Sequence, residues 1–509
     1  MAEHTLQAET NAEPAHREPT DRGHVGRSRR GLLGLATGAA AFAAVMKSAS
    51  AQPVRVKGDV DPSALLEKLV DRITFGATPE ELTLARQLGY QGYLEYQLNH
   101  LAINDTALDT RIAALTTLNM TYPQLEPQTF GFVRNELTEA TILRATFSKR
   151  QLFERMVELW TDHFNIDIVT VQYYKTADDR DVIRPNALGT FANLLNASAR
   201  SPAMLYYLNN DVSTSANPNE NYARELMELH TLGVDGGYTQ TDVRQVALCL
   251  TGWTIWKGAS TGVLEGTFRY NNTNHNQTAK TVLNTAIPTN GGQQDGITVL
   301  NLLINHPSTA RFIATKMCRH FLGYDVARSI IDQVAATYTS SGGDIKAMLR
   351  VVLRPEHIAA ATPKIKRPFH MFVAALRQTA ATVTSTASMR TRLNEAGHLP
   401  FSWLTPDGYP DKASHWAGNL IARWNYGASL VNGTTGSISG LAVNDVAFYT
   451  GATTADQMIA RIDDRLFGNR MDPDDRERIR QFLLPSPPTT TRRREAIGLA
   501  LSCPSYQWY

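Results

Sequence analysis

The sequence predicts a mainly α protein: a large multi-helix domain with long irregular loops and little strand. Three observations support this class. Apolar residues recur at spacings of three and four along most of the chain, as they do on one face of an α-helix. Helix start and stop signals bound many of these segments. Strand-like alternation is scarce, and hydrophobic residues (43%) and charged residues (19%) occur in proportions typical of a globular protein.

The first predicted helices are bounded by capping residues. Asp61-Pro62-Ser63 begins one helix, with proline in the first turn. Thr78-Pro79-Glu80-Glu81 has the pattern of a capping box and begins a second helix, which Gly89 is expected to end before a short third helix. Apolar spacing predicts one or two long helices over 131–164 and a further helix over about 185–199.

Residues 218–232 and 239–253 are predicted to form a pair of helices. Glycines in the connection 233–237 permit positive φ angles there. Residues 254–297 lack periodicity and are rich in Thr, Asn and Gly, so we expect a long ordered loop with room for a small hairpin and a candidate subdomain break. The remaining predicted helices are 297–304, 309–322, 327–340, 345–353, 367–384, 418–433, 454–467, 473–484 and 490–502.

The composition excludes several classes of protein. Lys and Arg (50) nearly balance Asp and Glu (48), so neither nucleic acid nor an anionic membrane is an expected partner. Three cysteines exclude a disulfide-dense scaffold. Cys249 and Cys318 lie in apolar helical contexts and are expected to be buried thiols, although the pairing of these two and Cys503 stays open. The sequence has no nucleotide-binding, dinucleotide-binding, c-type haem, HExxH or GxSxG motif.

Residues 1–51 contain the parts of a twin-arginine export signal. A polar segment precedes Arg29-Arg30, and a weakly apolar run of about 16 residues follows, shorter than the ~20 needed to cross a bilayer. Ala49-Ser50-Ala51 offers the small residues that a signal peptidase recognises, so cleavage is expected near Ala51. The prediction is a mature domain of residues 52–509, periplasmic or secreted and without a membrane span. The alternatives are an uncleaved anchor and a chance junction of basic and apolar residues.

Five segments, in this order, resemble one bacterial family, the "domain of unknown function 1800" family. They are RITFG (72–76), MVELWTDHFN (156–165), NPNENYARELMELHTLG (217–233), LTGW (250–253) and WLTPDGYP (403–410). The resemblance implies an exported, mostly helical protein. It also implies a frequent genomic neighbour from another exported family, similar to alkaline phosphatase and sulfatase folds. Many relatives carry a second histidine where this chain has Thr161, so a site that uses both histidines is in doubt.

His163 is the first candidate site residue. It closes a predicted long helix, next to Asp162 and three residues after Trp160. In a functional role, His163 would be a metal ligand or a general base that Asp162 orients. In a structural role, it would be a histidine favoured by the negative end of the helix dipole and packed beside a core tryptophan.

Glu225 and Glu228 form the second candidate pair. They lie three residues apart, so both carboxylates can face one point, as a divalent cation or an acid–base pair requires. The alternative is a structural network, in which Arg224 pairs with Glu228 and Asn219 and Asn221 cap the start of the helix.

Two further candidates lie in predicted loops. His275, five residues before Lys280, could complete a site made by helices, or it could be a solvated surface histidine. His320, near the end of the predicted helix 309–322, is expected to pack in the interior or to interact with the negative end of the helix dipole. The segment with Asp407, Tyr409, His415 and Trp416 is aromatic and acidic, as in loops that bind sugars or cover a core.

The leading hypothesis is an exported enzyme that uses metal-assisted hydrolysis, or another modification, on an extracellular polymer or ester. His163, Glu225 and Glu228 would be catalytic, and Arg224 would orient Glu228. The same three residues, with His275, are the candidate ligands of a divalent metal. The rival hypothesis is a non-catalytic exported scaffold, or a partner of a phosphatase-like or sulfatase-like exported protein, in which the same polar residues are structural.

Overall fold

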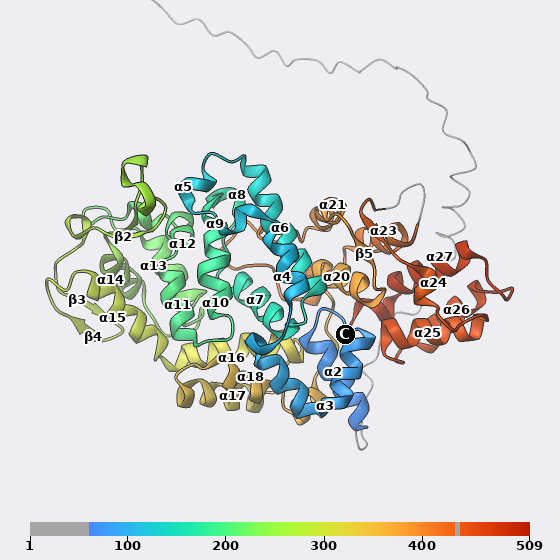
Figure 1. Ribbon diagram of the computed structural model, residues 1–509. Coiled ribbons are helices and arrows are strands. Elements are labelled where there is room, and N and C mark those ends of the chain that lie inside the picture. The colour runs from blue at the N-terminus through green and yellow to red at the C-terminus, as the bar shows by residue number, and fades with distance from the viewer. Residues whose placement is uncertain (1–60, 433–437) are drawn as a thin grey trace, which may run out of the picture. The chain divides into compact units, whose positions relative to one another are not determined.

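The computed structural model describes residues 61–432 and 438–509. The twin-arginine region 1–51 and its predicted cleavage point lie outside the described residues. Contacts group Gly58–Tyr509 into one compact unit. The predicted fold class is confirmed: the described chain is mainly helical, and its strands form small two-stranded sheets (Figure 1). No described helix is both long and apolar enough to cross a membrane.

The first helices begin at the predicted caps. Asp61 caps α2 (Pro62–Ile73) by accepting from the Ser63 N–H, and Thr78 and Glu81 form the capping box of α3 (Pro79–Leu98). Gly89 was expected to end a helix, and here the structure differs. With φ at 69°, Gly89 interrupts α3 locally, but helical residues continue on both sides, so the expected second and third helices form one kinked element.

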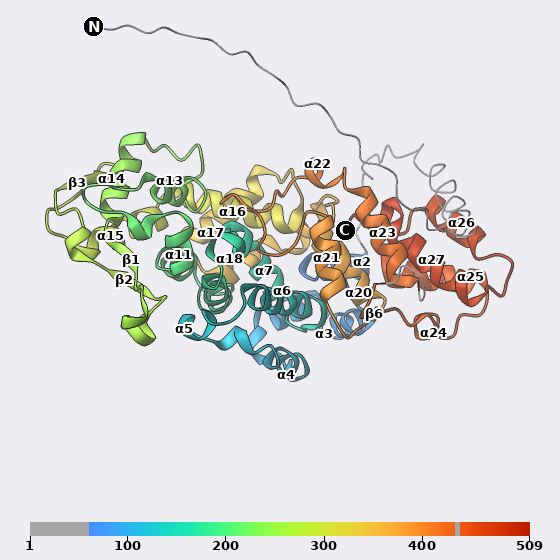
Figure 2. The ribbon, with the colours of Figure 1, turned by 90° about the horizontal axis from the view of Figure 1, so that it is seen from above.

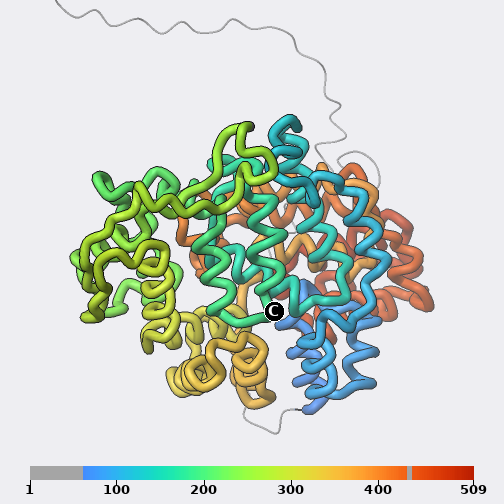
Figure 3. The backbone as a smooth tube through the Cα atoms, turned by 60° about the vertical axis from the view of Figure 1, so that its left-hand side comes forward, coloured from blue at the N-terminus to red at the C-terminus, as the bar shows by residue number. Residues whose placement is uncertain are grey.

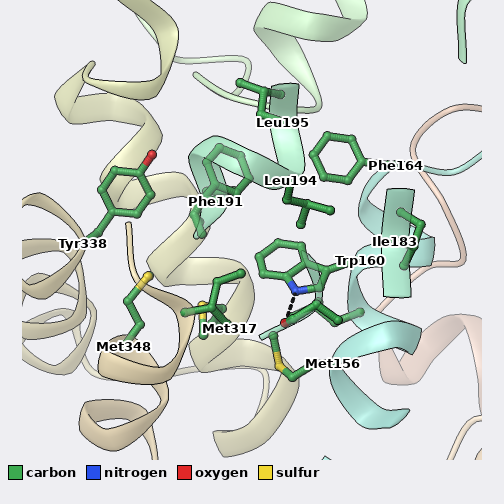
Figure 4. Close-up of a cluster of buried hydrophobic side chains, with 14 of the residues drawn as sticks. Met156, Trp160, Phe164, Ile183, Phe191, Leu194, Leu195, Met317, Tyr338 and Met348 are labelled. Atoms are coloured by element: carbon green, nitrogen blue, oxygen red, sulfur yellow. Dashed lines mark hydrogen bonds between the residues drawn. The ribbon is translucent and has the colours of Figure 1, made fainter. Parts of the chain in front are cut away.

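The long helices predicted over 131–164 come next, and the second of them packs against α2 and α3. Residues 131–164 form two helices, α6 (Phe130–Phe147) and α7 (Gln151–His163). Short helices precede them: α4 (Thr106–Ala113), α5 (Tyr122–Leu125) and the 3₁₀ turns His100–Ala102 and Thr116–Asn119. Trp160 of α7 is fully buried, and Figure 4 shows its ring among Met156, Phe164, Phe191 and Met317.

The helix predicted over 185–199 is shorter than expected. Helical structure begins earlier and then breaks at 187–190, and Thr190 caps α11 by accepting from the Asn193 N–H. The elements of this stretch are α8 (Ile168–Val171), α9 (Tyr174–Ala177), a π-helical turn (Asp178–Ile183), α10 (Arg184–Asn186), α11 (Phe191–Ala199), α12 (Pro202–Tyr207) and the 3₁₀ turn Asn210–Val212.

The predicted helix pair is present as α13 (Glu220–Glu228) and α14 (Gln240–Leu250). The following loop contains two antiparallel hairpins rather than one. They are β1 (Trp253–Ile255) with β2 (Phe268–Tyr270), and β3 (Lys280–Val282) with β4 (Thr285–Ile287); 3₁₀ turns cover Ala259–Leu264 and Asn272–Asn274. Both hairpins lie near α14 and α15 (Gln293–Ile304) in Figures 1 and 2.

Each of the later predicted helices is present with somewhat different ends, and the structure adds helices that were not predicted at Pro355–Ala360, Ala387–Glu395, Ala413–Trp416 and Asp445–Phe448. Pro368–Gln378 is shorter than the predicted 367–384, because the chain turns into a short strand at Thr382. The elements are α16 (Pro307–Leu322), α17 (Arg328–Ser341), α18 (Ile345–Val352), α19 (Pro355–Ala360), α20 (Pro368–Gln378), β5 (Thr382–Val383), α21 (Ala387–Glu395), α22 (Ala413–Trp416), α23 (Leu420–Val431), β6 (Leu441–Ala442), α24 (Asp445–Phe448), α25 (Ala455–Phe467), α26 (Pro473–Phe482), α27 (Thr490–Ser502) and the 3₁₀ turn Pro504–Gln507.

Two main hydrophobic clusters make up the core. The larger cluster collects buried side chains from α2 to α19, and α2 packs against α16 and α19. Figure 3 shows the first helices (blue) and the helices that follow residue 307 (yellow to gold) on the same side of the fold. The second cluster is built mostly by α20 to α27, with Phe75, Ile142 and Leu143 from the early part of the chain. Ile365 also pairs with Trp508 as an isolated bridge. Residues far apart in the sequence therefore complete both parts of the core.

Candidate functional site

The end of α7 is anchored by Trp160. The indole Nε1 donates a hydrogen bond to the carbonyl oxygen of Ala187 at 3.0 Å, and the ring is fully buried. Trp160 is therefore the core residue that the structural interpretation predicted. Because His163 is the last residue of α7, three positions later, this anchor also sets where the imidazole lies.

His163 is a buried imidazole with a partner at each ring nitrogen. Lys316 Nζ of α16 lies 2.9 Å from Nδ1, and Nε2 lies 3.1 Å from the carbonyl oxygen of His230. An ammonium group only donates, so Nδ1 accepts and the ring proton is assigned to Nε2. Burial, assisted by the Lys316 charge, lowers the pKa of His163 well below its ordinary value. His163 is therefore neutral at pH 7.

Lys316 was not predicted, and it is the central cation of this region. Burial lowers its pKa to about 8, while the carboxylates of Asp162 and Asp407 act in the opposite direction. The sequence did contain one signal, a lysine four residues after Phe312 in an otherwise apolar helix face; its ammonium lies 4.9 Å from that ring. Burial and Lys316 also lower the pKa of His230 to about 3, so His230 is neutral too.

The candidate carboxylates lie on α13, directly before His230. The Glu225 side chain is partly buried, and it forms no hydrogen bond or ion pair with any residue that the structure describes. Burial raises the pKa of Glu225, and the nearby charges of Glu228 and Asp407 add to this effect. Glu228 has one long contact, 3.4 Å from the Tyr238 hydroxyl. The predicted proximity of the two glutamates is thus reflected in their electrostatic coupling.

Arg224 does not orient Glu228, contrary to the sequence hypothesis. Its guanidinium donates to Gln240 Oε1 at 2.9 Å and lies 3.7 Å from Glu220, one helical turn earlier. Gln240 begins α14, which packs against α13, so this contact draws Arg224 toward the helix start. Arg224 still affects Glu225 at a distance, because its positive charge opposes the rise in the pKa of Glu225.

Asp407 joins the α13 carboxylates from a loop. Its carboxylate accepts from Trp403 Nε1 at 3.0 Å and from Thr405 Oγ1 at 2.5 Å. Asn165 donates to the carbonyl oxygens of Trp403 and Thr405, and Gly408 rests on the end of α7. A Cβ at Gly408 would lie 2.1 Å from the carbonyl oxygen of Asp162. The loop is therefore fixed against the same helix end as His163.

The aromatic part of this loop divides between interior and surface. Tyr409 and Trp416 are buried and donate to the carbonyl oxygens of Leu399 and Pro410, as in loops that cover a core. His415 is exposed, and Trp403 is half-buried. Leu404 is 74% exposed, and its carbonyl oxygen accepts from the Tyr207 hydroxyl at 2.6 Å. Leu404, Thr405 and Asp407 are exposed, so this part of the loop faces outward.

Asp162 does not orient His163, which corrects a second detail of the hypothesis. Arg367, next to the start of α20, donates to Asp162 Oδ2 at 2.5 Å and to Glu158 Oε1 at 2.5 Å. Burial raises the pKa of Asp162 to about 6, so the group stays ionised at pH 7 beside Arg367. The partner was not predictable from spacing, because Arg367 is 205 residues away.

His275 belongs to a separate buried network. Its Nδ1 lies 2.7 Å from the carbonyl oxygen of Thr251, and its Nε2 lies 3.2 Å from Asp295. Lys280 donates to the same Asp295 carboxylate at 2.7 Å. His275 is therefore neither a solvated histidine nor a neighbour of His163. His320 is buried as expected, and burial lowers its pKa well below the ordinary value.

The predicted common metal site is not formed. Across residues 61–432 and 438–509, no group of three or more His, Cys, Asp or Glu side chains is arranged to hold a metal ion. The four candidate ligands show why: Lys316 occupies Nδ1 of His163, and His275 lies in its own network. Asp407 is the group whose charge affects both Lys316 and Glu225, and the charge of Glu228 affects Glu225. We define the lysine–carboxylate cluster as Lys316, His163, His230, Glu225, Glu228 and Asp407.

Comparison with known proteins gives one match. A family described as "Protein of unknown function (DUF1800)" matches residues 68–508, nearly the whole chain. No curated protein and no solved structure matches this chain.

Proposed function

Because this chain belongs to the DUF1800 family, whose description assigns no reaction, we propose its function from its own side chains. The proposal is a hydrolase that cleaves an extracellular polymer or ester by general acid–base catalysis at the lysine–carboxylate cluster. It retains the reaction class expected from the sequence but uses carboxylates and a lysine in place of the predicted metal site.

The observation that carries the proposal is the environment of Glu225. A partly buried carboxyl group without a hydrogen-bond partner among the described residues, beside two other carboxylates, has a raised pKa. Such a group retains its proton to higher pH than an ordinary glutamate, and it can give that proton to a leaving group. Glu225 is therefore assigned as the general acid.

Asp407 is assigned as the general base. Two hydrogen bonds, from Trp403 and Thr405, orient its carboxylate beside the cluster. In the proposed step, Asp407 takes a proton from water and the water oxygen bonds to the substrate carbon. The bond between that carbon and the leaving oxygen breaks, and the leaving oxygen takes the proton of Glu225. Exchange with solvent then returns both groups to their starting states.

Lys316 and His163 have supporting roles in this proposal. The Lys316 ammonium would stabilise negative charge that develops on the substrate, since a fixed cation in a partly buried site is effective there. His163 accepts one hydrogen bond of Lys316 and thereby positions it. His163 is a positioning residue rather than a proton shuttle, because its proton is held by the His230 carbonyl.

The proposed test is the variant Glu225→Gln in the exported protein. A panel of p-nitrophenyl esters, p-nitrophenyl glycosides and soluble polysaccharides first identifies a substrate. We expect Glu225→Gln to lower kcat by roughly 10²–10⁴-fold, the usual contribution of a positioned acid. Wild-type activity should fall as pH rises through the raised pKa of Glu225, because the acid loses its proton, and the variant should lack this alkaline decline.

The control is Glu356→Gln, which changes an exposed glutamate on α19 without a recorded hydrogen bond to the described residues. It should leave kcat unchanged. Retention of activity within threefold in Glu225→Gln would contradict the proposal. A chain without hydrolytic activity that co-purifies with a phosphatase-like or sulfatase-like protein would favour the scaffold hypothesis instead.

The proposal includes export through the twin-arginine route, supported by the residues of the 1–51 segment. We expect the double variant Arg29→Lys, Arg30→Lys to accumulate in the cytoplasm. N-terminal sequencing of the exported wild type should begin at Gln52 if cleavage follows Ala51. An N-terminus at residue 1 in the exported fraction would instead indicate an uncleaved anchor.

A further inference from the structure

A cavity of about 600 Å³ lies at the opposite end of α7 from the lysine–carboxylate cluster. Phe153 and Glu154, in the first turn of α7, line it, whereas His163 ends the same helix. With a rise of 1.5 Å per residue, the positions of Glu154 and His163 are about 14 Å apart along the axis. The cavity is thus a separate feature, and its volume is in the range of sites for small organic molecules.

The carboxylates and the cationic side chains that line the cavity differ in whether they have partners in the protein. Two of its three carboxylates are already engaged: Glu154 accepts from Arg184 at 3.1 and 2.6 Å, and Asp105 accepts from the Ser148 hydroxyl at 2.6 Å. The third, Asp109, is largely exposed and lies 3.5 Å from Arg150. Each carboxylate of the cavity therefore has a hydrogen-bond donor or an arginine of the protein beside it.

Positive charge in the cavity is not fully matched. Lys346 of α18 forms no hydrogen bond or ion pair with any part of the chain that the structure describes. Nη1 of Arg144 is buried without a hydrogen-bond partner, and its nearest recorded carboxylate, Asp179, is 3.5 Å away. Buried donors without acceptors are unfavourable, and an anionic ligand would supply the acceptors.

One wall of the cavity is apolar. Leu108, Ile112 and Leu188 line it, together with Phe153. The Phe153 ring stacks on the His100 ring, with ring centroids 4.6 Å apart, and the Arg184 guanidinium lies 5.1 Å from the Phe153 centroid. The wall is therefore ordered before any ligand binds, which reduces the entropic cost of binding.

We propose that this cavity is a second binding site, for a small organic anion. Its carboxylate or phosphate group would bind Lys346 and Arg144, and its apolar body would lie against Leu108, Ile112 and Leu188. This site is independent of the proposed hydrolase activity, because it shares no residue with the lysine–carboxylate cluster.

The experiment is isothermal titration calorimetry of the full exported protein at low salt with four probes. Phenyl phosphate and phenylacetate carry the two anionic groups with an apolar body. Inorganic phosphate carries only the anion, and benzyl alcohol only the apolar body. We expect at least one of the first two to bind with one-to-one stoichiometry, and to bind at least tenfold more tightly than inorganic phosphate or benzyl alcohol.

The variant Lys346→Gln should weaken that binding on the order of tenfold, the usual effect of losing a charge-assisted hydrogen bond. It removes no recorded contact among the described residues, so the fold should be retained. Lys412→Gln, an exposed lysine outside the cavity, should bind as the wild type does. Failure of both aromatic anions to bind, or equal binding to wild type and Lys346→Gln, would overturn the proposal. Binding of inorganic phosphate as tight as that of phenyl phosphate would overturn the role of the apolar wall.

Discussion

Asp295 shows at the scale of one residue how this protein tolerates buried charge. Its carboxylate has two partners, Lys280 at 2.7 Å and His275 at 3.2 Å, and all three side chains are almost fully buried. Lys280 also donates to the carbonyl oxygens of Asn276 and Thr278. The network holds the loop after β2 against α14 and α15, so it is a structural device rather than part of the candidate site.

The variant Asp295→Ala should destabilise the protein by about 3–5 kcal/mol, since it leaves the Lys280 ammonium buried without a counter-charge. Urea unfolding followed by circular dichroism measures this change. Asp332→Ala is the matched control: Asp332 pairs with Arg311 at an exposed position, and its loss should cost about 0–1 kcal/mol. Equal midpoints for the two variants would show that Lys280 finds another partner or releases its proton.

Residue-scale prediction from sequence succeeded where the cause is local. Trp160 as a core residue and the closeness of Glu225 and Glu228 follow from spacing on one helix. Lys316 was missed because its environment is created by packing against His163, 153 residues earlier. The same cause explains why Asp162 was assigned to His163 rather than to Arg367.

At the scale of elements, prediction of helix starts was reliable because caps are local. Thr78, Thr239 and Thr454 each cap a helix near its predicted start with a capping box. Helix ends were less predictable. The helix predicted over 218–232 ends at Glu228, because Thr231 Oγ1 donates to the Leu226 carbonyl oxygen and the Leu232 N–H donates to that of Met227. These closing bonds end α13 early and bring the His230 carbonyl to His163.

Gly408 provides a test of how the loop with Asp407 is fixed. Its φ is 75°, and an added Cβ would lie 2.1 Å from the Asp162 carbonyl oxygen. Gly408→Ala should therefore destabilise the protein by about 2–4 kcal/mol, through both backbone strain and steric overlap. It should also displace Asp407 and lower any hydrolytic activity. Thermal unfolding and the activity assay measure the two effects.

Gly451→Ala is the control that introduces the backbone strain without the steric overlap. Gly451 has a similar φ of 79°, but nothing lies within 4 Å of an added Cβ. We expect this variant to lose only about 1–2 kcal/mol and to keep full activity. If both variants behave alike, the loop is not held against α7 as closely as described.

At the scale of the whole molecule, Arg377 of α20 connects the second hydrophobic cluster to early segments of the described chain. Its buried guanidinium donates to the carbonyl oxygens of Gly76 and Thr146, at 2.9 and 2.6 Å, and to Glu81 Oε1 at 2.6 Å. These contacts join the α2–α3 connection, the end of α6 and helix α20. No sequence pattern indicates such a connection, because Arg377 and its partner Gly76 are 301 residues apart.

Arg377→Ala should destabilise the protein by about 3–5 kcal/mol, because it leaves buried acceptors and the Glu81 carboxylate without a donor. Guanidinium unfolding and limited proteolysis near residues 74–81 would detect the change. Arg392→Ala, which removes a more exposed pair with Glu395, should cost about 0–1 kcal/mol. An Arg377 variant as stable as the Arg392 variant would show that hydrophobic packing alone joins these segments.

The distance in sequence between Gly76 and Arg377 also has a consequence during synthesis. At about 5–20 residues per second, the ribosome needs roughly 15–60 s to add the 301 residues between them. Phe75 waits about as long for Phe369, and longer for the members of its cluster that follow, up to Tyr506. For that interval, the nascent chain exposes an unfinished apolar surface. A chaperone that covers this surface during synthesis would protect the chain from aggregation until its C-terminal helices are made.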